Sequence, residues 1–192
     1  MFMPIFREDT LKKLDDYSGE FNPHLKTSDF SYEALEKLIK TYAQLYKALD
    51  GFWYLTAMDR SGNDEALTCD ILVWEKLCRY EMEKITKNFN IQGKDVKSLM
   101  KAFQLSPWAW NLKWDFEVLG DNHILWKVTH CPTVKALERE GRGRENDICN
   151  NVEVRLNRLY ASFFNPDIQV NCLKSPPRDN DDDYYCRWEF KL

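Results

Sequence analysis

The sequence predicts an α+β fold in which a helical hairpin and a short helix pack with a four-stranded antiparallel sheet. Through the first half of the chain, apolar residues recur at three- and four-residue spacing, the period of an amphipathic helix. After Pro107 the period becomes two, which is that of a half-buried strand. The second half follows the order β-β-α-α-β-β, and helices gathered on one face of an antiparallel sheet are typical of the α+β class.

The length, net charge and aromatic content of the chain limit the number of domains and the kinds of partner. The 192 residues are enough for one domain, so we expect a single domain over 1–192, with an irregular arm (1–28), a helical part (29–105) and an α+β part (106–192). The net charge of −4, without a basic cluster, argues against nucleic acid and anionic membranes as partners. No signal peptide and no long apolar run stand out, so we expect a soluble, cytoplasmic protein. An aromatic content of 14% predicts a thick core or a pocket lined with rings.

The helical part begins after an arm that carries enough apolar residues to pack on a partner, which is compatible with a homodimer. Ser31 is a suitable N-cap for the first helix, which we expect to run to about Met58. The break at 61–63 starts a second helix over about 63–88, and the two form an antiparallel hairpin. A third helix is expected over about 93–103. The apolar residues of the arm are Phe2, Ile5, Phe6, Leu11, Leu14 and Phe21; those of the first helix include Leu35, Leu38, Ile39, Tyr42, Leu45, Tyr46 and Leu49.

The sheet is expected from four alternating stretches. The first two strands, about 108–118 and 124–130, are joined by a turn at 120–122. Pro132 suits the first turn of a helix that ends by about Glu140, and a longer helix covers about 146–164. The third strand spans about 167–173, a solvated acidic loop follows, and the last strand ends the chain. Inward-facing positions are Trp108, Trp110, Leu112, Trp114, Phe116 and Val118; Ile124, Trp126, Val128 and His130; Ile168, Val170 and Cys172; and Tyr184, Cys186, Trp188, Phe190 and Leu192.

This alternation brings a histidine and several cysteines towards one place. His130, Cys172 and Cys186 fall on inward faces, while Cys131 and Cys149 stand near helix starts. Three or four such ligands could hold zinc or iron, and Cys131, Cys149 and Cys186 are the candidate metal ligands. The alternative is that they are buried thiols, because free cysteine behaves as a small hydrophobe and the spacing contains no C-x-x-C pair.

Cys131 is the best candidate for a catalytic thiol, with Cys149, Cys186 and His130 as the other candidate catalytic residues. A helix N-terminus lowers the pKa of a thiol, and His130 is its neighbour in sequence. Neighbours on a strand point to opposite faces, however, so the two side chains meet only if the chain turns between them.

A ligand pocket is the second kind of candidate site. Asp70 and Trp74 lie one helical turn apart and could face a pocket between the hairpin and the sheet. The alternatives are a solvated helix face for the carboxylates and a core position for the rings. The predicted pocket residues are Trp53, Asp70, Trp74, Trp110, Trp114 and Trp126.

The second half of the chain contains the motifs Thr129-His130-Cys131-Pro132, Asp147-Ile148-Cys149, Phe164-Asn165-Pro166 and the stretch from Asp183 to Phe190. These motifs resemble those of a known family, the L-2-amino-thiazoline-4-carboxylic acid hydrolase-like proteins of bacteria and archaea. The layout is also similar to that of the 4-vinyl reductase, hydrocarbon-binding domains. The front half, at 49–53, 66–67 and 73–74, resembles uncharacterised proteins of anaerobes that carry the hydrolase name. The resemblance covers about 45–192, and Trp188 stands where the family more often has Phe.

The resemblance implies a hydrolase in which water opens the cyclic C=N group of a thiazoline ring, in which one carbon is bonded to both the nitrogen and the sulfur, to give an N-carbamoyl-cysteine product. Cys131, Cys149 and Cys186 match the family pattern, and Cys172 is not carried over. Such chemistry needs a polarising acid or metal and a base or nucleophile. Two other hypotheses stay open. One is a non-catalytic binding or sensor domain with an aromatic-lined pocket, and the other is a cofactor-handling accessory protein.

Overall fold

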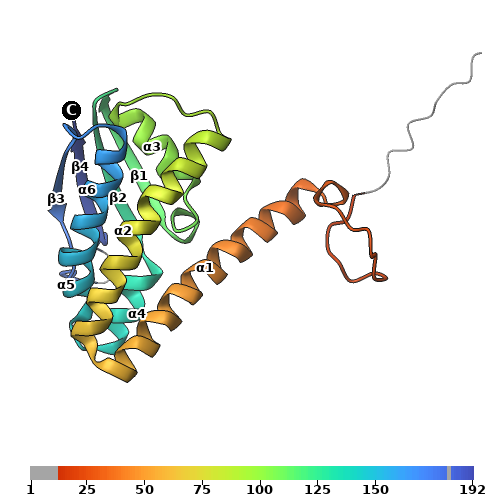
Figure 1. The fold of residues 1–192 in the computed structure, drawn as a ribbon, viewed down its shortest axis with the longest axis horizontal. Helices are drawn as coiled ribbons and strands as arrows, with labels where there is room; N and C mark the ends of the chain where they lie inside the picture. The colour runs from red at the N-terminus through yellow and green to blue at the C-terminus, as the bar shows by residue number, and fades with distance from the viewer. Residues whose placement is uncertain (1–12, 181–182) are drawn as a thin grey trace, which may run out of the picture. The chain divides into compact units, whose positions relative to one another are not determined.

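The computed structural model describes residues 13–180 and 183–192 (Figure 1). The chain divides into two compact units, 1–42 and 43–192. The division falls inside the first helix, so the single domain expected over 1–192 stays a prediction. The α+β prediction is confirmed, because helices are followed by a four-stranded antiparallel sheet. No helix among the described residues has the length and apolar character needed to cross a membrane.

The first unit contains the described part of the arm. Leu14 and Phe30 form an isolated β-bridge, and the Leu14 N–H donates to Asp29 O over 2.9 Å. A single 3-10 turn, Thr27–Asp29, precedes helix α1. Phe21 is 81% exposed and packs little within the described arm. Phe2, Ile5, Phe6 and Leu11, on which the expected partner contact depends, lie outside the described residues.

Three helices bring the chain to the sheet. Helix α1 (Tyr32–Ser61) passes through Gly51 without a break, and α2 (Asn63–Asn88) has the bounds predicted from the sequence. The turn between them needs Gly62, whose φ of 88° lies in the left-handed region that glycine tolerates best. Helix α3 (Val96–Leu105) starts at Asp95, whose side chain accepts from the Ser98 N–H at 2.7 Å.

The sheet has the strand order β1-β2-β4-β3, and each neighbouring pair is antiparallel. Its strands are β1 (Lys113–Gly120), β2 (His123–His130), β3 (Gln169–Lys174) and β4 (Cys186–Lys191). Trp126 pairs with Trp188, and Val128 pairs with Cys186. These inward positions follow the predicted alternation. Most of the outward positions are polar, and ion pairs such as Arg187–Glu117 at 2.9 Å join different strands there.

Helices α2, α3 and α6 cover the inward face of the sheet, and α6 lies beside α2 (Figure 1). Phe103, on α3, lies at the centre of the core between these helices and the sheet. Its ring lies 5.2 Å from that of Trp108, 5.3 Å from Tyr160 and 5.8 Å from Phe190. Rings packed edge to face in this way add attraction beyond the burial of their area.

Between β2 and β3 the helices differ in one respect from the prediction. Helix α4 (Pro132–Glu140) has its predicted bounds and ends at Gly141, whose φ is 70°. The single helix expected over about 146–164 is instead a short α5 (Arg144–Asp147), a π-helical segment (Ile148–Val152) and α6 (Glu153–Phe164). Apolar periodicity gives no warning of the wider π turn, because the core positions Val152 and Leu156 keep a helical spacing through it.

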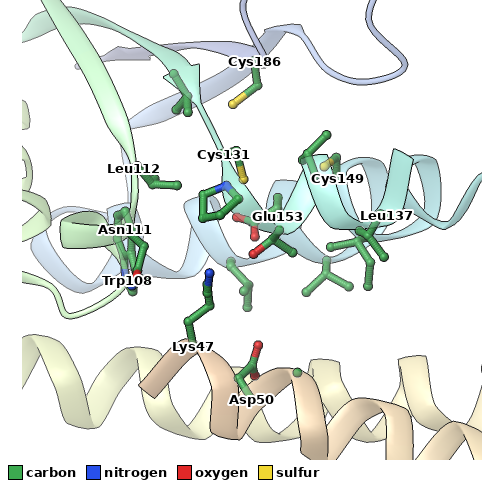
Figure 2. A pocket seen from close by; sticks show the side chains of 18 of the residues that line it. Lys47, Asp50, Trp108, Asn111, Leu112, Cys131, Leu137, Cys149, Glu153 and Cys186 are labelled. Carbon is green, nitrogen blue, oxygen red and sulfur yellow. The ribbon is translucent and has the colours of Figure 1, made fainter. Parts of the chain in front are cut away.

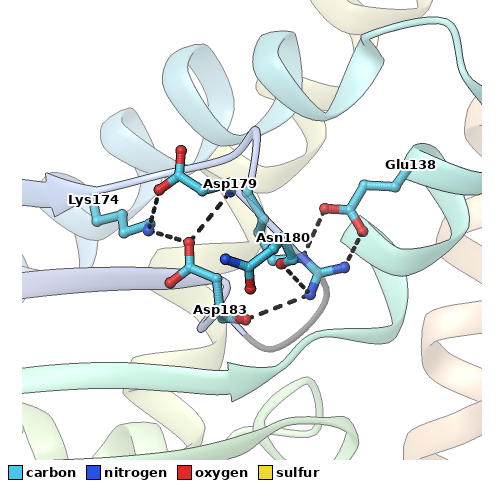
Figure 3. A network of polar contacts seen from close by, with 6 residues as sticks. Glu138, Lys174, Asp179, Asn180 and Asp183 are labelled. Atoms are coloured by element: carbon cyan, nitrogen blue, oxygen red, sulfur yellow. Dashed lines mark hydrogen bonds and ion pairs between the residues drawn. The ribbon is translucent and has the colours of Figure 1, made fainter.

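Ion pairs hold the loop between β3 and β4 against the rest of the second unit, so the loop is not wholly solvated (Figure 3). Arg178 donates to both carboxylate oxygens of Glu138 on α4, at 2.8 and 2.7 Å. Lys174 forms an ion pair with Asp183 and a longer one with Asp179 at 3.4 Å. The expectation of a solvated acidic run is therefore wrong for Asp183, which Lys174 neutralises.

Two further expectations are corrected. The first strand begins at Lys113 rather than at Trp108, because Ala109–Asn111 form a 3-10 turn and Trp108 is drawn into the core beside Phe103. The apolar stripe of α1 is not buried along its length, and Leu45 and Leu49 are mostly exposed. The reason is that the part of α1 within the second unit buries another side, which carries Ala43, Tyr46, Asp50 and Tyr54.

Candidate functional site

A cavity of about 350 Å³ lies within the second unit, among α1, α2, β2, α4 and α6 (Figure 2). This volume falls in the range of small-molecule pockets. Asn111 fixes the α1 wall, because its side-chain amide donates to Ala43 O at 2.8 Å. Pro176, on the charge-tied loop, closes part of another wall.

Most of the cavity wall is apolar. It is formed by aromatic and aliphatic side chains from every surrounding element, which suits an organic ligand better than a fully hydrated ion. Among the lining residues are Trp74, Trp108, Trp126, Trp188, Leu112, Val128, Val134, Leu137, Ile148, Val152 and Leu156.

Three carboxyl groups interrupt this apolar wall: Asp50 on α1, Asp70 on α2 and Glu153 at the start of α6. The π-helical segment ends directly before Glu153, and such segments are frequent at functional sites. Figure 2 shows the carboxylates of Asp50 and Glu153 directed into the cavity. Glu153 lies deep within the fold, yet its side chain is accessible to water from the cavity.

Each of these carboxyl groups has a raised pKa. Burial, together with the charge of Asp50, raises the pKa of Asp70 to about 7. Burial, together with the charges of Asp70 and Asp50, raises the pKa of Glu153 to about 7. The pKa of Asp50 also rises through burial, against the hydrogen-bonding influence of the Trp74 indole. Groups perturbed in this way and gathered in one cavity are typical of functional sites.

A second cluster of polar side chains, centred on Glu81, lies behind one part of the cavity wall. Tyr160 donates to Glu81 Oε2 at 2.7 Å, and burial raises the pKa of Glu81. Three buried atoms nearby, Glu81 Oε1, Tyr46 Oη and Trp108 Nε1, have no hydrogen-bond partner among the described residues. The Trp108 indole is close enough to oppose the rise in the pKa of Glu81, but it makes no hydrogen bond of good geometry. Since Tyr46 and Trp108 line the cavity, this part of the wall can accept a polar group from a ligand.

Cys131, Cys149 and Cys186 all line the cavity, as their shared predicted role requires (Figure 2). Burial raises the pKa of Cys131 to about 11, and it raises the pKa values of Cys149 and Cys186 as well. The backbone N–H groups of Val134 and Thr133 at the start of α4 lower the pKa of Cys131 only in part. The expected activation of Cys131 by the helix N-terminus is thus outweighed by desolvation, and the thiols are neutral near pH 7.

The metal role of these cysteines stays a prediction. In the described part of the chain, no group of three or more His, Cys, Asp or Glu side chains is arranged to hold a metal ion. Zinc or iron would also have to displace the thiol protons.

His130 does not share the cavity with Cys131. Its ring lies edge-on to Tyr185, with 5.9 Å between centroids, and it is absent from the lining. Burial lowers the pKa of His130, and the charge of Lys135 adds to the effect. The divergence of neighbouring strand residues therefore separates the predicted pair.

The predicted pocket residues divide evenly. Asp70, Trp74 and Trp126 line the cavity. Trp53, Trp110 and Trp114 do not: Trp53 is 58% exposed, Trp110 is 44% exposed in the 3-10 turn, and Trp114 packs on Phe116 with 4.7 Å between ring centroids. These three residues are therefore absent from the cavity lining: Trp53 and Trp110 are exposed to solvent, and Trp114, although it pairs with Val128 on the inward face, lies beyond the cavity wall.

Sequence reasoning missed Tyr46, Lys47, Asp50 and Glu153 as members of the site. A signal was available on α1, where Tyr46, Asp50 and Tyr54 recur every four residues and so share one face. For Glu153 the only signal is its place four residues after Cys149.

The comparisons with known proteins give a family and no function. The search of curated proteins found no significant match, and neither did the search of solved structures. The resemblance to the hydrolase-like family stays a prediction. A family of unknown function, DUF6125, matches residues 28–192, which include every residue of the cavity. The chain therefore belongs to DUF6125.

Proposed function

We propose that this protein binds a small organic molecule in the cavity of its second unit. The observation that carries the proposal is a cavity of about 350 Å³ whose apolar wall holds a few polar groups of perturbed pKa. Small-molecule sites have this composition, with apolar contacts supplying affinity and a few polar groups fixing orientation. A cytoplasmic location and a homodimer remain predictions alongside it.

Aromatic anchoring supports the proposal. Trp108 lies 5.8 Å from Trp126 and 6.1 Å from Tyr160, and Tyr46 lies 6.3 Å from Trp74, each measured between ring centroids. These rings hold each other in place, so the wall needs little ordering when a ligand binds.

Gly51 offers a direct test, because it lines the cavity and a Cβ there would meet no atom within 4 Å. Gly51→Leu should place a side chain in part of the cavity and obstruct it, and, since leucine favours helix over glycine, it should raise the free energy of unfolding by up to about 1 kcal/mol. Indole and benzyl alcohol are suitable neutral probes, with binding followed by isothermal titration calorimetry.

The wild type should bind at least one probe, and Gly51→Leu should lose that binding while staying folded. The matched control is Gln44→Leu, which places the same side chain on an exposed position of α1 outside the cavity. Failure of the wild type to bind either probe, or equal binding by Gly51→Leu, would overturn the proposal.

A second candidate function is the hydrolysis of a cyclic C=N substrate, as the family resemblance implies. The observation that favours it is the pKa of about 7 for Asp70 and Glu153, which suits a general acid and a general base at neutral pH. Glu153 would then take a proton from the water that attacks the C2 carbon of the ring, and Asp70 would protonate the ring nitrogen. The bond between C2 and the ring sulfur would break, and the sulfur would leave as a thiol with the proton that Glu153 had taken. With neutral thiols, Cys131, Cys149 and Cys186 would shape the site rather than attack.

The test is turnover of 2-amino-thiazoline-4-carboxylate, with the N-carbamoyl-cysteine product measured by chromatography. Glu153→Gln should lower turnover by at least about a hundredfold, the usual contribution of a positioned acid or base. Cys131→Ser should retain most of the activity. Loss of turnover in Cys131→Ser with its fold intact would instead assign a nucleophilic or metal-binding thiol. Absence of product with the wild type would remove this candidate.

A further inference from the structure

We infer that the cavity takes a ligand with an ammonium or amidinium group, held between Asp50, Asp70 and Glu153, with an apolar body against the tryptophans. This inference rests on the proposed binding function and names the chemical class of its ligand.

The first observation is that, in the part of the chain that the structure describes, the three cavity acids form no ion pair with a basic side chain, whereas two glutamates close to the cavity do. Just outside the lining, Glu140 pairs with Arg144 at 2.6 Å and Glu138 pairs with Arg178 at 2.7 Å. Within the described residues, Asp50, Asp70 and Glu153 make no ion pair at all. They come from three separate helices, so the fold itself brings unpaired acids to one cavity.

The cations that the chain places in the cavity do not cancel this excess. Arg144 lines the wall, but its guanidinium is engaged by Glu140 and lies over the Tyr54 ring at 5.2 Å. Lys47 remains, with its amine directed into the cavity in Figure 2. One lysine facing three carboxyl groups leaves a site that attracts positive charge.

A second, independent observation lies behind the wall at Tyr46, one helical turn before Asp50 on α1. Glu81 is only 7% exposed, and its Oε1 has no hydrogen-bond partner among the described residues. Tyr46, which feels the charges of both Glu81 and Asp50, also has an unpartnered hydroxyl. Buried acceptors without donors are costly, so a donor-rich group bound in the cavity beside Tyr46, with Glu81 behind it, would be favoured here. An ammonium or amidinium group donates several hydrogen bonds and accepts none.

The aromatic wall fits the same ligand class. Trp74 stands between the Asp50 and Asp70 carboxyls and influences both, so a cation bound there would meet the ring as well. Tryptophan attracts cations most strongly among the aromatic residues. The volume of about 350 Å³ suits an amine with one ring or a short chain rather than a long polycation.

The raised pKa values of Asp70 and Glu153 make the affinity for a cationic ligand depend on pH. Without a ligand, Asp70 and Glu153 are partly protonated at neutral pH, and a bound cation would drive their protons off. Affinity should therefore rise between about pH 6 and pH 8, and binding near pH 7 should release protons. The titratable and charged groups facing the cavity are Tyr46, Lys47, Asp50, Tyr54, Asp70, Cys131, Arg144, Cys149, Glu153, Tyr160 and Cys186, with Glu81 behind them.

The experiment compares benzylamine with benzyl alcohol, which have the same ring and nearly the same size but differ in charge. Calorimetry at about pH 8 should show benzylamine binding at least about tenfold more tightly, the discrimination expected of one charge-assisted contact. Asp70→Asn and Glu153→Gln should each lower the affinity for benzylamine far more than the affinity for benzyl alcohol, so that most of that advantage disappears. Asp59→Asn, at an exposed position of α1 outside the cavity, is the matched control and should change neither.

Titrations of the wild type in buffers of different ionisation enthalpy measure proton release, and they do not depend on the folding of any variant. Release on benzylamine binding near pH 7 supports the inference. Equal binding of both probes, or tighter binding of the alcohol, overturns the cation assignment and leaves the binding function standing. If neither probe binds, the proposed function fails together with the inference.

Discussion

Replacing Asp70 with asparagine should stabilise the protein, and the gain should grow with pH. The pKa of Asp70 rises from 3.8 to about 7 on folding. Between these values the folded state holds a proton that the unfolded state has lost, so stability falls as pH increases through this window. At about 1.4 kcal/mol per pH unit the loss has an upper limit of roughly 4 kcal/mol. Water in the cavity screens the charge, so we expect roughly 1–3 kcal/mol.

Asparagine keeps the shape of Asp70 and cannot ionise. Urea denaturation should give similar free energies of unfolding for the wild type and Asp70→Asn near pH 4. Near pH 8 the variant should be more stable by the amount above, while Asp59→Asn at its exposed position should follow the wild type throughout. A difference that stays constant with pH, or a variant that is less stable at pH 8, would refute the view that burial of Asp70 disfavours its ionised form.

Three other predictions concern separate parts of the site. Tyr160→Phe removes the donor to Glu81 Oε2 and should lower the free energy of unfolding by about 1–3 kcal/mol in urea denaturation; an unchanged value would show that Glu81 finds another donor. Glu138→Gln weakens the two-point contact with Arg178, so limited proteolysis should cut the loop around 175–180 faster than in the wild type; equal rates would mean that the contact does not hold this loop. Iodoacetamide near pH 7.5 should alkylate Cys69 well before the cavity thiols Cys131, Cys149 and Cys186, as read by mass spectrometry of the peptides; preferential labelling of Cys131 would indicate a thiolate and contradict its raised pKa.

Much of the fold could be predicted from the sequence because local signals marked its boundaries. The stretch at 61–63 separates α1 from α2, and Pro132 and Gly141 delimit α4. Alternation along β2 and β4 identified Trp126 and Trp188 as inward-facing, and the structure pairs them. In each case the signal lies within a few residues of the feature that it predicts.

The errors arise where a local pattern has more than one tertiary outcome. Trp108 and Trp110 continue the alternation of β1, but the chain turns there, and packing against Phe103 decides the position of Trp108. The leucines of α1 predicted an apolar stripe, but their spacing does not show which side of the helix is buried.

The candidate site was predicted in part for the same reason. Strand alternation and helix starts placed Cys131, Cys149 and Cys186 together, and all three line the cavity. Their protonation could not be predicted, because desolvation depends on surrounding atoms from distant segments. Of the three unpaired acids only Asp70 was predicted to face a pocket. Asp50 and Glu153 were missed, since they resemble ordinary solvated helix residues until the helices are assembled.

The most direct test of the account is a ¹H–¹⁵N spectrum of the seven tryptophan indole N–H groups during titration with benzylamine. Trp74, Trp108, Trp126 and Trp188 line the cavity, whereas Trp53, Trp110 and Trp114 lie outside it and serve as internal controls. Saturable shifts confined to the first group are the predicted result. Shifts confined to the second group, or none at concentrations up to about 10 mM, well above the weakest binding that such a pocket should give, would contradict a ligand site in this cavity.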